Sequence, residues 1–516
     1  TAAWITLGMI ALVMITLLGY RAAQVNTGDF PYGHAAFASY AVAAMLRPLG
    51  TGANSVIETV MLLANVAVVM GFGVFVTYSK HLHIVMAPLN VAFSRRPRAL
   101  GALGELPAAA PAQTPQLELL TWKQRLDTLT CTECGRCQSA CPAWNSGQPL
   151  SPKLLIMGLR DGLMASADGN GHGNGSGEPA AALIGKDVLW SCTTCGACVE
   201  QCPVDIEHVD TIVHLRRQLV DAGELEPAVQ QVLQNDATQG NSFGKSGRMR
   251  ARWTKELGFA VKDARKEPVK SLWFVGDFAS FDERLQVLSR SLAHILRDAG
   301  VDFGMLFDGE RDDGNDVRRI GEEGLFQMLA EQNMESFRAA SFDEIFTTDP
   351  HSFNTLRNEY PAFGLDKPVL HYSQLLGRLL ADGSIPVDPL GMRVTYHDPC
   401  YLARHNRLTD PPRQVLAALG CELAEMPRNG LNTFCCGAGG GRIWMTEPAQ
   451  TERPSESRIR EAVALGVDHF VVACPKDFVM YSDAVKTTGN EDRITVIDLV
   501  QLVDRARRPV AALETV

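Results

Sequence analysis

The stretch from Cys131 to Pro203 decides the fold, because it contains one twelve-residue pattern twice. The copies read Cys131-Thr-Glu-Cys134-Gly-Arg-Cys137-Gln-Ser-Ala-Cys141-Pro142 and Cys192-Thr-Thr-Cys195-Gly-Ala-Cys198-Val-Glu-Gln-Cys202-Pro203. Each follows C-x2-C-x2-C-x3-C-P, the spacing with which bacterial ferredoxins hold two 4Fe-4S clusters, the fourth Cys of each run ligating the other cluster. The predicted ligand sets are therefore Cys131, Cys134, Cys137 and Cys202 for one cluster, and Cys192, Cys195, Cys198 and Cys141 for the other.

Structural zinc is the alternative explanation for clustered cysteines. A zinc ion needs four ligands, usually supplied by two separated C-x2-C pairs. Eight cysteines in two identical runs, each followed by Pro, exceed that requirement. The repeated pattern therefore favours a module that carries electrons, and other parts of the chain must supply and remove them.

Composition limits the class of protein. A length of 516 residues allows about three domains. The net charge of -10 and the scattered basic residues exclude nucleic acid as a partner. A homo-oligomer is compatible with the sequence. Thirteen cysteines, nearly all in ligand-like spacings, argue against disulfides and for a reducing compartment. Thr1 lies directly inside an apolar run, which indicates a processed chain or missing upstream sequence.

Three uncharged apolar runs precede the cysteines: Thr1–Tyr20, Phe30–Leu46 and Thr59–Ser79. We predict a membrane span for each, since a helix needs about 20 apolar residues to cross a bilayer, although the second run is short. Basic residues follow the third run, at Lys80, Arg95, Arg96 and Arg98. The positive-inside rule then predicts a multi-pass plasma-membrane protein, in contact with lipid, whose soluble domains lie in the cytoplasm.

Histidines at the end of the third run have two interpretations. His81 and His83 are either interfacial polar residues or haem ligands. The stretch Tyr78–Pro88 resembles the last helix of the nitrate-reductase gamma-subunit family of dihaem cytochromes b, where Ser-basic-x-x-His-x-x-x-x-Pro carries a haem ligand. That resemblance implies that His83 ligates haem b, that His81 falls at a free position, and that the second axial ligand is His34 or lies upstream.

Two further segments separate the apolar runs from the C-terminal half. Ala102–Pro115 is rich in Ala and Pro, which predicts a semi-stiff linker. Helical spacing on both sides of the cysteine runs predicts a helical ferredoxin domain. Asn241–Leu257 interleaves basic and aromatic residues, and it is either a solvated face or a docking surface for an acidic redox partner.

From Ser271 onward, short β-rich runs alternate with helical ones, which predicts an α/β domain with parallel strands. The predicted strands are Leu272–Val275, Val301–Leu306, Glu344–Thr347, Arg393–Tyr396, Phe470–Ala473 and Ile494–Ile497. The last part of this region contains Cys400, Cys435-Cys436-Gly437 and Cys474-Pro-Lys-Asp477. It resembles the cysteine-rich CCG domain of heterodisulfide reductase, in which a Cys, a Cys-Cys-Gly and a Cys-x-x-Cys hold an unusual iron-sulfur cluster.

That resemblance implies a third cluster, on Cys400, Cys435, Cys436 and Cys474, either linear with three irons or a cubane. Asp477 replaces the last Cys of the family pattern, and it is either an oxygen ligand or a helix-start residue. Gly437 and Gly439 belong to a glycine run that we expect to bring backbone N–H groups close to sulfur. Cys421 lies at no ligand position, and we expect a buried core thiol there.

An internal repeat extends this assignment. An offset of 123 residues places Asp277 on Cys400, and it places Asp312-Asp313-Gly314 on Cys435-Cys436-Gly437. A slip of two residues then places Asp349 on Cys474 and Ser352 on Asp477. Because carboxylates and hydroxyls are poor iron-sulfur ligands, we predict that the first half holds no cluster.

Four segments carry a resemblance that covers nearly the whole chain: Asn241–Gly244, Phe353–Pro361, His397–Leu402 and Phe434–Arg442. They are similar to the fused membrane iron-sulfur reductases related to the D and E subunits of heterodisulfide reductase. The actinobacterial branch of this family implies an oxidoreductase that takes electrons from the electron-transfer flavoprotein of fatty-acid β-oxidation and reduces menaquinone. Electrons would pass through the third cluster, the two cubanes and haem b.

Two alternatives remain open: a heterodisulfide-reductase-like thiol-disulfide oxidoreductase, and the iron-sulfur subunit of a 2-hydroxy-acid or glycerol-phosphate dehydrogenase. The predicted fold is multidomain, with a transmembrane α-helical anchor, a helical two-cluster ferredoxin domain and tandem α/β CCG domains. The predicted boundaries are 1–100 for a cytochrome b-like region, 101–116 for the linker, 117–265 for the ferredoxin domain, 270–390 for the first CCG repeat and 391–510 for the second.

Overall fold

The computed structural model of the chain describes residues 2–33, 35–96, 99–104, 116–167, 184–446 and 452–508. Contacts divide the chain into two compact units, Thr1–Leu89 and Asn90–Val516. The predicted haem ligand His34 lies outside the described residues.

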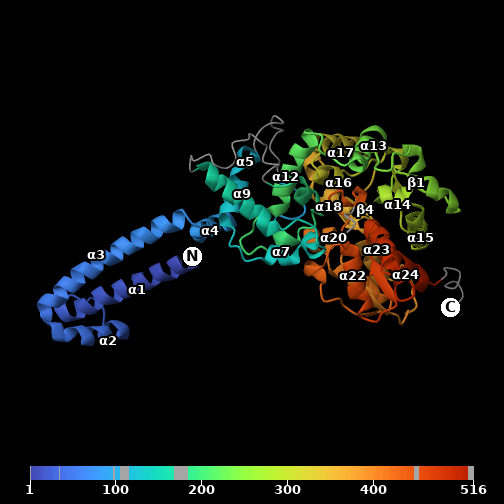
Figure 1. Cartoon of the computed structure of the whole chain (residues 1–516). Coiled ribbons are helices and arrows are strands. Elements are labelled where there is room, and N and C mark those ends of the chain that lie inside the picture. Colours follow the sequence, from blue (N-terminus) through green and yellow to red (C-terminus); the bar gives the residue numbers. More distant parts are fainter. Residues whose placement is uncertain are drawn as a thin grey trace. The chain divides into compact units, whose positions relative to one another are not determined.

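The first unit is a helical hairpin. Its helices are α1 (Ala2–Thr27), α2 (Phe37–Leu46), α3 (Gly50–Thr77) and the start of α4 (His83–Phe93), with short 3-10 turns at Arg47–Leu49 and Lys80–Leu82. Helices α1 and α3 lie side by side (Figure 1). Asn65 Nδ2 on α3 donates to Val13 O at 3.0 Å and to Thr16 Oγ1 at 2.9 Å on α1. Such interhelical amide contacts are typical of helix pairs whose surroundings are apolar.

The predicted separate span at Phe30–Leu46 is wrong. Helix α2 has ten residues, and at 1.5 Å per residue it is about 15 Å long, half of the roughly 30 Å bilayer core. Two segments, Ala3–Thr27 and Phe37–Thr77, are long and apolar enough to cross a membrane. The start of α1 meets the 3-10 turn Lys80–Leu82 that follows α3, since Thr6 Oγ1 lies 2.9 Å from His81 Nε2.

The second unit begins with a helical domain around the cysteine runs. Its helices are α5 (Gln116–Leu119), α6 (Trp122–Thr130), α7 (Arg136–Ala140), α8 (Pro142–Asn145), α9 (Pro152–Ala167), α10 (Lys186–Trp190), α11 (Ala197–Gln201), α12 (His208–Asp221) and α13 (Pro227–Gln239). A capping box at Thr121 and Gln124 starts α6 and directs the chain into Cys131. The helices expected before Cys131 and after Cys202 are therefore present.

Two parallel sheets form the rest of the second unit. The first has strand order β1-β3-β2-β4-β5, with β1 (Lys262–Asp263), β2 (Ser271–Phe274), β3 (Phe303–Met305), β4 (Glu344–Thr347) and β5 (Val369–His371). The second has order β7-β6-β8-β9, with β6 (Arg393–Tyr396), β7 (Glu422–Leu423), β8 (His469–Val472) and β9 (Thr495–Asp498). All six predicted strands are present, within a few residues.

Helices connect the strands of both sheets. The first sheet has α14 (Asp277–Phe281), α15 (Glu283–Asp298), α16 (Asn315–Ile320), α17 (Glu323–Arg338), α18 (Pro350–Asn358) and α19 (Tyr372–Ala381). The second has α20 (Cys400–Asn406), α21 (Asp410–Ala418), α22 (Pro454–Val463), α23 (Pro475–Thr487) and α24 (Leu499–Ala506). Short 3-10 turns occur at Gly247–Met249, Arg252–Glu256, Phe307–Gly309, Tyr360–Phe363, Gly430–Asn432 and Arg442–Trp444.

The two sheets repeat one arrangement, with β2-β3-β4-β5 equivalent to β6-β7-β8-β9. Asp277 is the first residue of α14, and Cys400 is the first residue of α20. Asp349 and Cys474 each precede a helix that begins with Pro. The aligned positions thus lie at the carboxyl ends of equivalent parallel strands, where such sheets bind ligands.

The basic segment Asn241–Leu257 is not a solvated face throughout. Arg250 and Trp253 are each 1% exposed, and Arg250 ion-pairs with Asp277 and Glu310 at 2.7 and 2.9 Å. Neither residue is available to a docking partner.

Candidate iron-sulfur centres

The first predicted ligand set comes together in the structure. Cys131, Cys137 and Cys202 are buried and Cys134 is exposed. Burial, followed by the neighbouring thiols of Cys131, Cys202 and Cys134, raises the pKa of Cys137 to about 12. Cys202 belongs to the second run and lies beside Cys137 of the first, which is compatible with the crossed arrangement of a two-cluster ferredoxin.

The second ligand set is fully buried. Burial is the main cause that raises the pKa of Cys198, and the thiols of Cys192 and Cys141 add to it. Cys141, from the first run, has Cys192 as a close thiol neighbour, and burial raises its pKa to about 12. Thiolates this close together would repel one another, and ligation to positive iron ions would offset that repulsion.

The backbone of both runs is shaped to surround a cluster. Glu133 and Thr194 have φ of 58° and 50°, and the following Gly135 and Gly196 have φ of 80° and 72°. These left-handed residues turn amide groups inward, and Thr194 N donates to Cys192 Sγ at 3.3 Å. Amide donors at sulfur stabilise the negative charge of a ligated cluster.

The third ligand set is partly assembled. Thiols of Cys195, Cys400 and Cys436 donate towards Cys435 and hold the pKa of Cys435 well below its usual range. Gly437 N donates to Cys435 Sγ at 3.4 Å, as predicted for this glycine. Cys195 belongs to the second ferredoxin set, so the two cluster sites are in direct contact through Cys195 and Cys435.

Asp477 links the remaining cysteine to this group. Its carboxyl interacts with the thiols of Cys436 and Cys474, while burial raises the pKa of Asp477 to about 7. Its Oδ2 atom lies 3.6 Å from Nε2 of the buried His397. Asp477 lies in the first turn of α23 and also faces thiols, so its placement is compatible with both interpretations.

The glycine run has a second role that the sequence did not reveal. A Cβ on Gly439 would lie 2.5 Å from Thr193 O, and a Cβ on Gly440 would lie 3.0 Å from Cys192 O. Gly439 thus packs against the Cys192–Cys195 loop, and the second amide at sulfur comes from Ala438, at 3.5 Å from Cys436 Sγ. Only glycine lets the two cluster-binding loops approach so closely.

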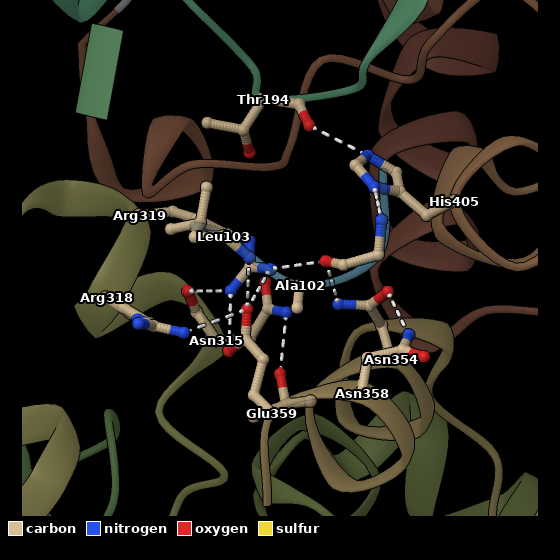
Figure 2. Close-up of polar contacts among 12 residues, drawn as sticks. Ala102, Leu103, Thr194, Asn315, Arg318, Arg319, Asn354, Asn358, Glu359 and His405 are labelled. Atoms are coloured by element: carbon tan, nitrogen blue, oxygen red, sulfur yellow. Dashed lines mark hydrogen bonds and ion pairs between the residues drawn. The ribbon is translucent and has the colours of Figure 1, made fainter. Parts of the chain in front are cut away.

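Three side chains with N–H donors bind the backbone carbonyls of the same loop. Arg216 Nη2 donates to Cys192 O at 2.6 Å and Arg404 Nη1 donates to Cys195 O at 2.8 Å. His405 Nε2 donates to Thr194 O at 3.1 Å (Figure 2). Sequence reasoning missed all three residues, although Arg404 and His405 lie on the same short helix as Cys400.

Residues 99–104, here called the strap, join this network and correct the predicted linker. Gly101 N donates to His405 Nδ1 at 3.0 Å, and burial lowers the pKa of His405 to about 3, which keeps the ring neutral. Gly101 O accepts from Arg319 Nη2 at 3.2 Å, and Leu103 N donates to Glu359 at 3.1 Å (Figure 2). The strap is therefore a packed part of the junction, and residues 105–115 lie outside the described structure.

The ligand positions of the first half hold carboxylates. Ser352 Oγ donates to Asp313 Oδ2 at 2.5 Å, which mirrors the pairing of Asp477 with Cys436. Each half also sends a side chain to the other. Lys476 pairs with Asp316 at 2.8 Å, and the ring of His351, at the equivalent position, lies 4.2 Å from that of Tyr401.

The histidines at the end of the hairpin differ in which ring nitrogen is available. His83 Nδ1 lies 2.8 Å from Lys80 O, so Nδ1–H donates to this carbonyl and Nε2 keeps its lone pair. His81 Nε2 instead contacts Thr6. A backbone carbonyl that fixes the ring is typical of metal-ligating histidine, so His83 fits an axial haem position better than His81 does.

Comparisons with known protein families support iron-sulfur sites in this chain. Residues 123–203 match the family model of a 4Fe-4S dicluster domain, and residues 394–479 match that of a cysteine-rich domain. The chain is an oxidoreductase with iron-sulfur centres.

Three relatives define its family. The chain is 36% identical to a probable iron-sulfur-binding oxidoreductase, FadF, of Bacillus subtilis (strain 168), over 90% of this chain and 72% of the relative. It is 37% identical to a probable membrane-anchored ferredoxin of Chromohalobacter salexigens, over 82% of this chain and 68% of the relative. It is 34% identical to the EtfAB:quinone oxidoreductase of Syntrophomonas wolfei, over 86% of this chain and 67% of the relative. The chain belongs to this family of iron-sulfur oxidoreductases, as its motifs predicted.

Proposed function

We propose that this chain oxidises a reduced electron-transfer flavoprotein and passes the electrons to menaquinone in the plasma membrane. The contact between Cys195 and Cys435 carries the proposal, because it joins the dicluster domain to the cysteine-rich domain without an intervening gap. The relative from Syntrophomonas wolfei, whose name specifies EtfAB and quinone, supports the choice of donor and acceptor.

In this proposal the crossed ferredoxin sets hold two 4Fe-4S clusters, and Cys400, Cys435, Cys436 and Cys474 hold a third with Asp477 beside them. When bound, these clusters supply one-electron carriage between two-electron partners. The chain excludes water from the second and third sets, since their cysteines are all buried. Arg216 and Arg404 place positive charge beside Cys192 and Cys195 and thereby stabilise a reduced site.

The order of the sites within the second unit supports a direction of electron transfer, from the third set towards the first. Asn90, at its start, donates to Val204 O at 2.8 Å, two residues after Cys202. The first set therefore lies beside the segment that follows the apolar helices in sequence. The third set contacts the second set through Cys435 and Cys195 and belongs to the sheet domain, where we propose that the flavoprotein docks from the cytoplasm.

The test is an anaerobic reaction of the purified protein with reduced electron-transfer flavoprotein and a menaquinone analogue. We expect quinol formation and bleaching of the iron-sulfur absorbance, both dependent on the flavoprotein. Failure of both would overturn the proposal. Reduction of a heterodisulfide by quinol would instead favour the thiol-disulfide alternative. Reduction of quinone that requires an added 2-hydroxy-acid or glycerol-phosphate dehydrogenase subunit would favour the role of iron-sulfur subunit in such a dehydrogenase.

For the membrane end, we propose that His83 ligates haem b. We expect His83→Ala to abolish the b-type α band in a reduced-minus-oxidised spectrum, because this variant removes the available Nε2 lone pair. His81→Ala is the matched control and should keep the band. A normal band in His83→Ala, or no band in the unaltered protein, would contradict the assignment.

A further inference from the structure

A second buried site lies in the first half of the repeat. Asp277, Asp312 and Asp349 stand at the backbone positions that Cys400, Cys435 and Cys474 occupy in the second half. They line a cavity of about 20 Å³, which is close to the space of one water-sized sphere. The pseudo-equivalent positions of the second half hold the third ligand set, so this cavity corresponds to a ligand position of the repeat.

The oxygen donors in the cavity have the spacing of a cation site. Carboxylate oxygens of Asp236, Asp277 and Asp312 all lie within 4.8 Å of one another. Two oxygens on opposite sides of Ca²⁺, each at about 2.3–2.6 Å, are separated by about 5 Å. The three carboxylates could therefore contact one ion with little movement.

Asp236 points independently to a ligand. It belongs to α13, outside the repeat, and reaches the cavity with 2% exposure. Its Oδ1 atom has no hydrogen-bond partner in the described part of the chain. A buried carboxylate oxygen without a donor is costly, and a cation in the cavity would satisfy it.

The charges around the cavity are unbalanced. Six aspartates line it: Asp236, Asp277, Asp312, Asp313, Asp316 and Asp349. Lys476 and Arg250 ion-pair with two of them, Asp316 and Asp277, and Arg250 is shared with Glu310. A divalent cation would offset part of the remaining negative charge.

We propose that this cavity binds one hard divalent cation, Mg²⁺, Mn²⁺ or Ca²⁺, through Asp236, Asp277 and Asp312. Carboxylate oxygens select such ions, whereas thiolates select iron-sulfur clusters. The replacement of thiolates by carboxylates in the first half thus changes the bound species. The ion would tie α13 of the ferredoxin domain to the first sheet.

Mn²⁺ titration of the full, cluster-loaded chain tests the site. The protein is treated anaerobically with EDTA, its iron content is checked, and free Mn²⁺ is followed by EPR. We expect one saturable site, competed by Mg²⁺ or Ca²⁺, and a rise in the thermal unfolding midpoint. Asp236→Asn, which keeps the side-chain size, should weaken Mn²⁺ binding by about 10-fold or more and remove the thermal shift.

Asp302→Asn is the matched control, because Asp302 is half-exposed and pairs with Lys262 on the same domain. It should leave Mn²⁺ binding unchanged. The proposal is overturned if the unaltered protein has no saturable Mn²⁺ site, or if Asp236→Asn binds as tightly as the control. The titration needs no electron transfer, so it is independent of the flavoprotein assay.

Discussion

Replacing Cys435 with serine is expected to lower flavoprotein-dependent quinone reduction by about 100-fold or more, beyond the 10–100-fold that loss of an outer partner of a metal site costs. Cys435 is the centre of the third ligand set, since thiols of Cys195, Cys400 and Cys436 all converge on it. A serine hydroxyl is a poor ligand for iron-sulfur clusters. The same change also removes the sulfur that interacts with Cys195 of the second ferredoxin set.

Iron content and EPR spectra measure the result. Cys435→Ser should lose the signal of the third cluster and keep those of the two ferredoxin clusters, whose eight cysteines are unaltered. Cys421→Ser is the matched control, because Cys421 is partly buried, rather than fully buried as predicted, and packs at the edge of a core away from the ligand sets. Full activity and unchanged iron in Cys435→Ser would contradict the assignment of this cysteine.

Replacing Gly439 with alanine is expected to force apart the two cluster-binding loops. The added Cβ would lie 2.5 Å from Thr193 O, a backbone atom between Cys192 and Cys195 that cannot move without moving the ligands. Overpacking of this kind costs about 1–3 kcal/mol. We expect a lower thermal unfolding midpoint, faster loss of iron on heating, and weaker magnetic interaction between the second and third clusters in EPR.

Gly324→Ala provides the control, because Gly324 lies in α17, where an added Cβ would meet no neighbouring part of the chain within 4 Å and where φ is not positive. Alanine favours a helix interior, so this variant should be as stable as the unaltered protein or more stable. An unchanged midpoint and unchanged iron retention in Gly439→Ala would show that the loops do not pack as described.

Much of the architecture was accessible from the sequence. The two cysteine runs predicted that Cys202 lies beside Cys137 and Cys141 beside Cys192, because a fixed ligand spacing leaves few ways to wrap a chain around two clusters. The repeat offset placed Asp277 opposite Cys400, and both residues begin a helix after equivalent strands. These predictions depend on local spacing and periodicity, which can be read from a single sequence.

Contacts between distant segments were not accessible in this way. Nothing near Gly439 shows that the glycine run packs on Thr193, and nothing near Gly101 shows that the strap binds His405. Arg250 resembled a surface residue because its partners, Asp277 and Glu310, lie far away in sequence. The second apolar run was misassigned as a span because composition alone does not reveal that α2 ends after ten residues.

The exchange of Lys476 and His351 between the halves makes each half depend on the other. Each half completes the surroundings of the other, in the way that two subunits of a symmetric dimer share a pocket. A half that has lost its thiolates therefore cannot be deleted without damaging its neighbour. The two halves therefore behave as one structural unit, although the described ligand positions of the first half hold carboxylates and those of the second hold thiols.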